Sequence, residues 1–170
     1  VYFKQKIYDQ TLHYLQKTLE VSERIGDAYL SGTTYNNIAD TLTQLGRYQD
    51  ALEPAYKAEN YLDSLDSFLL ADLYRILSVI KMNTNSLEEA FSYAVKATMR
   101  LLQHKCFLFT TEIIEQLVMT TNKITRYEPE TFDHKTMVLK QLKERVVEEL
   151  RIAGLNDTAK KIEKIFTVNL

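Results

Sequence analysis

The sequence predicts an all-α fold, a stack of antiparallel helical hairpins. Its 170 residues contain only four glycines and two prolines, far fewer breaks than a chain of many short strands needs. In addition, the segment 48–58 recurs as the segment 87–97, at an offset of 39 residues. Four residues keep their places: Ala51 with Ala90, Ala55 with Ala94, Lys57 with Lys96, and Ala58 with Ala97. Alanines that recur every three or four residues form one stripe of a helix, and such a stripe lets a neighbouring helix pack closely. Helices are expected at about 3–25, 28–45, 48–63, 67–83, 87–103, 106–124, 131–153 and 156–167.

The first expected helix is a weaker copy of the repeat, at an offset of 40 residues. The matching pairs are Tyr8 with Tyr48, Leu12 with Leu52, Leu15 with Ala55, and Lys17 with Lys57. The chain is therefore expected to begin in mid-repeat, with its first repeat truncated. It opens at Val1 without an initiator methionine, so we expect it to be a piece of a longer protein.

The next four helices are expected to form two hairpins, over 28–63 and over 67–103. Gly46 lies at the first turn and can take the left-handed conformation that ends many helices. Asn85 takes the same place in the second turn, and Ser86 is placed to cap the helix that follows.

Two single residues carry expectations of their own. Pro54 lies inside a predicted helix, where it removes one backbone hydrogen bond, so a kink is expected there. Cys106 precedes Phe107 and is expected to be a buried small apolar residue. A reactive thiolate is not expected, because His104 is two residues away and would point to a different helix face.

The last two helices depart from the repeat. Pro129 can open the first of them, Gly154 can close it, and Asn156 or Asp157 can cap the second. We expect residues 1–127 to form the helical repeats, and residues 128–170 to form capping helices of the same domain, which cover the end of the stack. Apolar residues recur at helical spacing in this segment: Val138, Leu142, Val146, Leu150 and Ala153. This stripe either packs back on the stack or meets a second copy in a homodimer.

Three short segments match a known repeat pattern. They are Tyr35-x-x-Ile-Ala39, Leu45-Gly46-Arg47-Tyr48 and Ala51-x-x-x-Ala55-x-x-Ala58. In these segments the chain resembles the tetratricopeptide repeat (TPR) family, whose usual repeat has about 34 residues. The resemblance implies a right-handed superhelical solenoid of TPR-like hairpins, acting as a non-catalytic scaffold or interaction module that binds a protein or peptide. The longer repeat also resembles the repeat domain of bacterial peptide-sensing regulators, so a peptide-sensing domain of a larger transcriptional or signalling regulator is the alternative function.

The resemblance further implies that ligand contacts come from the first helix of each hairpin, on the face opposite the packed one. In the helix at 28–45 this face carries Asn36, Asn37 and Asp40. Side-chain amides donate and accept hydrogen bonds at once, which suits the backbone of an extended peptide. The alternative is a solvated polar helix face.

The helix at 67–83 continues this groove with Arg75, Val79 and Asn83. Arg75 can pair with a ligand carboxylate, whereas Val79 offers apolar contact or packs against the adjacent repeat. Family members that grip a C-terminal carboxylate use a clamp of lysine, arginine and asparagine. Asp40 and Ile76 stand where parts of that clamp are expected, which argues against this ligand class.

Several classes of function are disfavoured. A net charge of −2 gives no general attraction to nucleic acid, and no apolar run reaches the roughly 20 residues of a membrane span. The histidines lack the spacing of a helical metal site, and no glycine-rich phosphate loop is present, so we expect neither an enzyme nor a cofactor. A single cysteine suits a reducing compartment, and the cytoplasm is the expected location.

Overall fold

The structure, a computed structural model, describes residues 2–105, 107–127 and 132–169. Within these ranges it consists of helices and their connecting turns, without any strand. The elements are α1 (Tyr2–Ile25), α2 (Ala28–Gln44), α3 (Tyr48–Ser64), α4 (Leu70–Asn83), α5 (Leu87–His104), η1 (Phe107–Phe109), α6 (Thr110–Tyr127), α7 (Phe132–Ile152) and α8 (Asn156–Asn169). The all-helical prediction is confirmed. In the described part of the chain, each helix is too short or too polar to cross a membrane.

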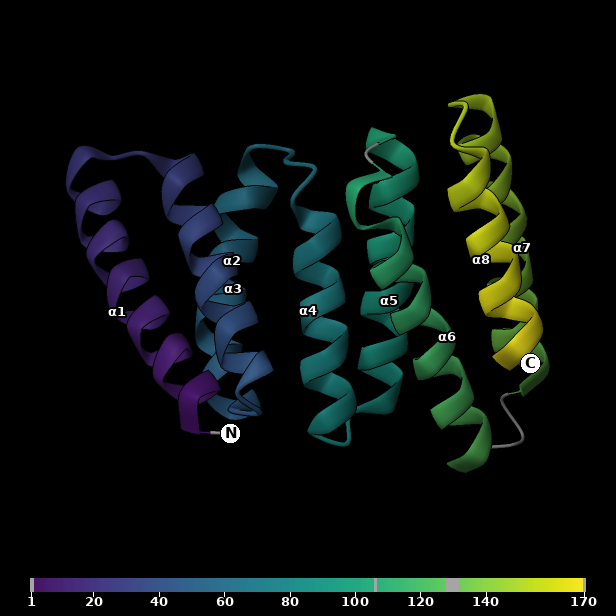
Figure 1. The fold of residues 1–170 in the computed structure, drawn as a ribbon, viewed down its shortest axis with the longest axis horizontal. Coiled ribbons are helices and arrows are strands. Elements are labelled where there is room, and N and C mark those ends of the chain that lie inside the picture. Colours follow the sequence, from purple (N-terminus) through teal and green to yellow (C-terminus); the bar gives the residue numbers. More distant parts are fainter. Residues whose placement is uncertain (1, 106, 128–131, 170) are drawn as a thin grey trace.

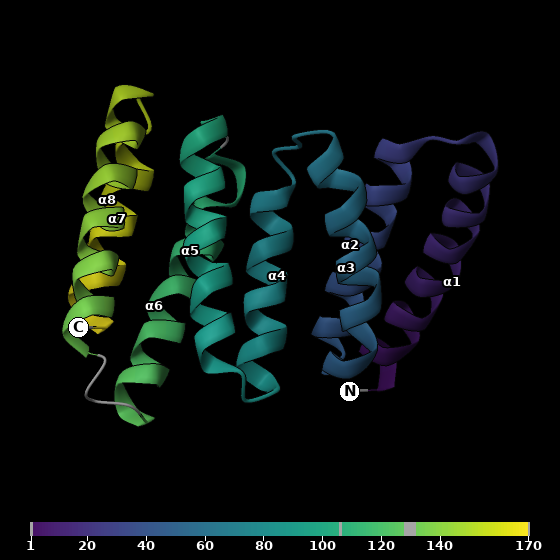
Figure 2. The same cartoon turned by 180° about the vertical axis from the view of Figure 1, so that it is seen from behind.

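The helices pack as consecutive hairpins along one axis (Figure 1). The most extensive helix pairs are α2 with α3 and α4 with α5. These hairpins join where α3 contacts α4, while α5 contacts α6, and α1 packs on α2 at one end. In Figure 1 α2, α4 and α6 lie toward the viewer, and in Figure 2 the opposite face shows α3 and α5. The predicted stack of antiparallel hairpins is confirmed.

A seam of small side chains explains how closely the paired helices approach. The seam alanines are completely buried: Ala51, Ala55, Ala58, Ala90, Ala94 and Ala97. Gly32 of α2 belongs to the same seam. A Cβ at this position would lie 2.9 Å from Cβ of Tyr61 and 3.0 Å from Cδ2 of Leu62. A residue with a side chain would therefore push α2 away from α3.

The two copies of the repeat, residues 48–58 and 87–97, make the same contact with the helix that precedes each of them. Lys57 Nζ lies 5.3 Å from the ring centroid of Tyr35, and Lys96 Nζ lies 5.5 Å from that of Tyr74. The two tyrosines are 39 residues apart in sequence, and so are the two lysines. The sequence repeat is therefore a structural repeat, with one cation–π contact between the two helices of each hairpin.

The turns form largely as the residue types predict. Gly46 has φ +73° and Asn85 has φ +62°, so both take the left-handed conformation expected of them. Gly154, with φ +78°, ends α7 in the same way. Ser86 occupies the position before α5 but makes no capping hydrogen bond with its side chain, which corrects that expectation.

The start of α4 was predicted three residues too early. Asp66 takes a left-handed conformation with φ 44°, which extends the turn after α3. The hydroxyl of Ser67 accepts a hydrogen bond from the backbone N–H of Leu69, and the regular helix begins only at Leu70. Serine favours such local bonds over the helical pattern, which explains the delay.

Of three other residues that carry a prediction, the structure describes one, Pro54. Pro54 lies within α3, which continues without a break from Tyr48 to Ser64. Cys106 and Pro129 lie outside the described residues.

The two C-terminal helices pack against the stack. Helix α7 contacts α5 and α6, and α8 contacts α6. Leu142, Val146 and Leu150 are buried in the common core. The predicted apolar stripe thus packs back on the chain and is not available to a second copy, so a homodimer remains a prediction with no surface assigned to it. Lys135 of α7 fixes this arrangement by donating a hydrogen bond to Glu88 of α5.

The partly buried tyrosine of α5 makes stability sensitive to alkaline pH. Burial raises the pKa of Tyr93 to about 12, and the carboxylate of Glu59 acts in the same direction. The folded chain thus holds this proton more tightly than the unfolded chain. The resulting contribution to stability is complete below about pH 10, the usual tyrosine pKa, and is lost as the pH rises toward 12.

We therefore expect the substitution Tyr93→Phe to reduce the alkaline loss of stability by about 1 to 2 kcal/mol. Urea unfolding at about pH 9 and at about pH 11.5 measures that loss in both proteins. Part of the loss should remain in the variant, because a hydrogen bond to Glu89 raises the pKa of Lys81 as well. An identical pH dependence in the two proteins would show that Tyr93 does not contribute.

Candidate binding groove

The face formed by α2, α4 and α6 is the candidate site. Contacts join α2 to α4 and α4 to α6, and the three helices run in the same direction along one side of the stack (Figure 1). Each of them follows a turn that comes from the opposite face of the stack. From the sequence, ligand contacts are expected on helices in this position. We call this face the groove.

A charged cluster lies where α2 meets α4. Arg75 Nη2 is 2.7 Å from Asp72 Oδ1 on the same helix, at the i, i+3 spacing that places two residues side by side. It is also 3.4 Å from Oδ1 of Asp40 on α2. All three side chains are substantially shielded from solvent, with exposed fractions of 20% for Arg75, 11% for Asp72 and 30% for Asp40. The guanidinium thus links two successive hairpins.

Asn36 lies beneath this cluster and is not on the open surface where the sequence placed it. Only 4% of the residue is exposed. Its Nδ2 is 3.4 Å from Oδ2 of Asp72, a weak hydrogen bond across the α2–α4 contact. Its Oδ1 is buried and accepts no hydrogen bond from any residue that the structure describes. A buried carbonyl oxygen without a donor is a costly arrangement.

The charges of the cluster do not balance. Asp40 and Asp72 contribute −2 and Arg75 contributes +1, which leaves −1. A ligand carboxylate would have to displace Asp72 from the guanidinium and would meet two like charges. These contacts disfavour the expectation that Arg75 takes a ligand carboxylate, which remains untested. The net negative charge of the junction favours a ligand group that carries a positive charge.

The other predicted groove residues lie farther along the same face. Asn37 is exposed on α2, and Val79 is half-buried on α4. Asn83 is exposed one turn beyond Val79, and its Nδ2 donates a hydrogen bond to the Val79 carbonyl. The structure thus joins Asn36, Asp40 and Arg75 into one cluster through Asp72. Asn37, Val79 and Asn83 lie outside that cluster.

A second feature of the groove, which the sequence did not identify, is a hollow between α4 and α6. Its volume is about 370 Å³. The lining residues are Met82, Met119, Asn122, Lys123, Arg126 and Tyr127. Lys123 Nζ donates a 3.0 Å hydrogen bond to the Met82 carbonyl at the end of α4. Flexible methionine side chains suit a surface that adapts to different apolar groups.

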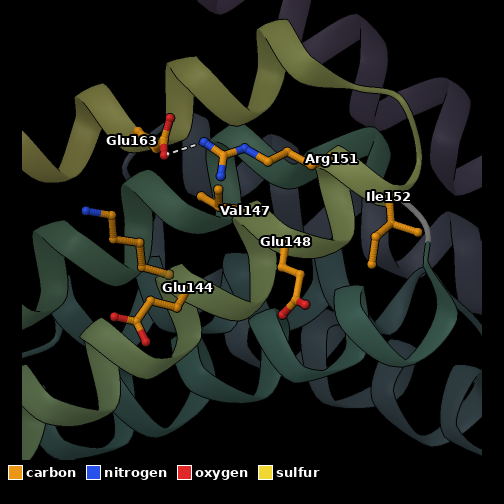
Figure 3. A pocket seen from close by; sticks show the side chains of 7 residues that line it. Glu144, Val147, Glu148, Arg151, Ile152 and Glu163 are labelled. Atoms are coloured by element: carbon orange, nitrogen blue, oxygen red, sulfur yellow. Dashed lines mark hydrogen bonds and ion pairs between the residues drawn. The ribbon is translucent and has the colours of Figure 1, made fainter.

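A larger hollow, of about 440 Å³, lies against α7 and α8. Figure 3 shows Arg151 of α7 reaching Glu163 of α8, at 2.8 Å, while Glu144, Glu148 and Ile152 project beside them. The carboxylates and cations there are mostly exposed, and none belongs to a constellation that suggests catalysis. Among the described residues, no group of three histidine, cysteine or acidic side chains is placed to hold a metal ion.

The comparisons with known proteins agree with this geometry. Residues 1–64 match the family model described as tetratricopeptide repeat. The matched segment covers α1, α2 and α3, and the hairpin of α4 and α5 repeats the packing of α2 and α3. A search of curated proteins found no match. Residues 1–64 are therefore similar to the tetratricopeptide repeat family.

Proposed function

We propose that this chain is a non-catalytic module that binds a partner polypeptide along the groove. Tetratricopeptide repeats generally mediate protein–protein interaction or scaffolding, and the family is typically non-catalytic. The proposed ligand is an extended peptide segment. It places a lysine or arginine side chain at the α2–α4 junction and an apolar side chain in the methionine-lined hollow between α4 and α6.

The observation that carries this proposal is the excess of negative charge at the junction. Asp40 and Asp72 share a single cation, and the buried oxygen of Asn36 lacks a donor among the described residues. An ammonium or guanidinium group would supply the missing positive charge. Because Asp40 keeps 30% of its side chain exposed, an incoming cation can reach it from solvent.

The hollow supports the apolar part of the proposal. Met119 is 55% exposed and Met82 forms the floor with 9% exposure, so a ligand side chain would cover thioether and methyl groups that water now contacts. Asn37 and Asn83 are exposed on the same face, where their amides can bond to a ligand backbone. The groove thus combines one site for charge, one for apolar contact and two amides.

The test begins with selection of binding peptides from a displayed library. We expect the selected peptides to share a basic residue and an apolar residue. Asp40→Asn should weaken their binding about tenfold, because a charge-assisted hydrogen bond contributes about 1.5 to 3 kcal/mol. Isothermal titration calorimetry measures the affinity.

Asp50→Asn provides the matched control. Asp50 is an exposed aspartate that pairs with Arg47 at 2.7 Å at the start of α3, outside the groove. This substitution should leave peptide affinity unchanged. Selected peptides that are acidic, or that bind equally well to the Asp40→Asn variant, would contradict the proposed groove.

A further inference from the structure

A chain of hydrogen bonds reaches the charged cluster from the first helix. The hydroxyl of Tyr8 on α1 donates a 2.7 Å hydrogen bond to Oε1 of Gln44, the last residue of α2. Nε2 of Gln44 donates in turn to Oδ2 of Asp40, which lies one helical turn earlier. The other oxygen of this carboxylate, Oδ1, faces the guanidinium of Arg75 on α4. These four side chains thus form one polar chain across α1, α2 and α4.

The chemistry of its two partners fixes the orientation of the Gln44 amide. An ionised carboxylate only accepts hydrogen bonds, so the amide has to turn its N–H₂ group toward Asp40. The amide oxygen then accepts the hydrogen bond of the Tyr8 hydroxyl. If the amide were rotated by a half turn, its oxygen would face the carboxylate and two acceptors would oppose each other. Tyr8 and Asp40 therefore hold the same amide orientation from both sides.

The oxygen of this amide can accept a second hydrogen bond. A carbonyl oxygen has two lone pairs, and the bond from Tyr8 uses one of them. Gln44 is exposed, so a donor from a ligand can approach the second lone pair. Oε1 and Nε2 are bonded to the same carbon atom, and Nε2 contacts Asp40. A cation that contacts the Asp40 carboxylate can therefore contact Oε1 of Gln44 as well.

The end of α2 gives an independent reason to expect a cation from a ligand here. The last carbonyl groups of a helix form a negative pole, which favours positive charge. The last turn of α2 contains no basic residue, whereas α4 has Lys81 and α6 has Arg126 in that place. Asp40 adds a negative charge close to the same end. A basic side chain of a ligand would supply the positive charge that the other two helices of the groove supply themselves.

We propose that Gln44 is a specificity-determining residue of the groove: together with Asp40 it binds the basic side chain of the partner, and the hydroxyl of Tyr8 holds its amide in the orientation that this binding requires. The role rests on the proposed function, because Gln44 and Asp40 act on the same cation. Their i, i+4 spacing places both side chains on one face of α2, where one ammonium or guanidinium group can bridge them. Tyr8 is a positioning residue, since it acts through Gln44.

Two substitutions at Gln44 test its role as an acceptor. The probe is a basic peptide selected from the displayed library, and calorimetry measures its affinity for the full chain. Gln44→Ala removes the acceptor and should weaken binding about three- to tenfold. Gln44→Glu keeps an acceptor oxygen and adds a negative charge, so it should tighten binding about two- to fivefold. If Gln44 only oriented Asp40 through its N–H₂ group, both variants would bind more weakly.

Gln141 is the matched control for both substitutions. It is an exposed glutamine on α7, outside the groove. Gln141→Ala and Gln141→Glu repeat the same truncation and the same change of net charge. All affinities are measured at about 0.15 M salt, where exposed charges more than about 8 Å apart are largely screened. Neither control variant should change the affinity for the peptide.

The positioning role of Tyr8 is tested by a double-mutant cycle. Tyr8→Phe lets the Gln44 amide rotate and should weaken binding about two- to threefold. The same substitution should have no further effect in the Gln44→Ala variant, a result that a merely structural role for Tyr8 would not give. Tyr14→Phe, at a tyrosine of the same helix that is 67% exposed, should leave the affinity unchanged. Circular dichroism confirms that each variant is folded.

The outcomes separate this role of Gln44 from the proposed function. Binding that Asp40→Asn weakens but Gln44→Ala leaves unchanged would overturn the role of Gln44 and leave the groove in place. A Gln44→Glu variant that binds no more tightly than the parent chain would also overturn it. An effect of Tyr8→Phe that persists in the Gln44→Ala variant would overturn the positioning role of Tyr8. A library that yields no basic peptide would contradict the proposed function, and the role of Gln44 would fail with it.

Discussion

Replacement of Ala55 by leucine is expected to lower the free energy of unfolding by about 1 to 3 kcal/mol. Ala55 lies in the middle of the seam between α2 and α3 and is completely buried. Leucine adds three carbon atoms where the two helices leave no space, so α2 must move away from α3. Ala94 occupies the same position in the next hairpin, and Ala94→Leu should cause a loss of similar size.

Ala153→Leu is the matched control for this substitution. Ala153 follows the last residue of α7 and is exposed, so the larger side chain should change stability by no more than about 0.5 kcal/mol. Urea unfolding measures all three variants against the parent chain. If Ala55 tolerated leucine as well as Ala153 does, the close packing of the seam would be disproved.

The second large effect is expected for Arg75→Ala, which should cost about 2 to 4 kcal/mol of stability. This substitution leaves the carboxylate of Asp72, 11% exposed, without its cation, and removes the link from α4 to Asp40 on α2. Removal of one partner from a shielded ion pair is costly because the remaining charge stays desolvated. Thermal and urea unfolding both report the loss.

Two comparison variants separate charge from general damage. Arg47→Ala removes an exposed arginine that pairs with Asp50, and should cost less than about 1 kcal/mol. The double substitution Asp72→Leu with Arg75→Met removes both charges and should recover most of the stability. Failure of this double variant to recover would mean that the loss in Arg75→Ala does not come from an unpaired carboxylate.

The sequence predicted those parts of the fold that depend on local spacing. The alanine stripes of α3 and α5 are visible as a period along the chain, and Gly46 and Asn85 mark the turns through their own backbone preferences. The start of α4 was missed, because the left-handed conformation of Asp66 reflects the turn as a whole and no glycine marks it.

The candidate site was predicted less completely, because its geometry depends on how neighbouring hairpins meet. The periodicity of α2 alone places Asn36 on the polar face, but α4 covers that part of the helix and buries the residue. The contact of Arg75 with Asp40 joins residues 35 positions apart, which no local pattern reveals. Asp72 could have been recognised as a partner of Arg75 from its i, i+3 spacing.

The central claim, that the face of α2, α4 and α6 binds a partner polypeptide, can be tested with the four methionines of the chain. Met82 and Met119 line the hollow of this face, whereas Met99 lies on α5 and Met137 on α7. The most direct measurement is methyl NMR of methionine-labelled protein during titration with a selected peptide. We expect the signals of Met82 and Met119 to shift while those of Met99 and Met137 stay in place. Shifts of Met99 or Met137 with Met82 and Met119 unmoved would contradict it.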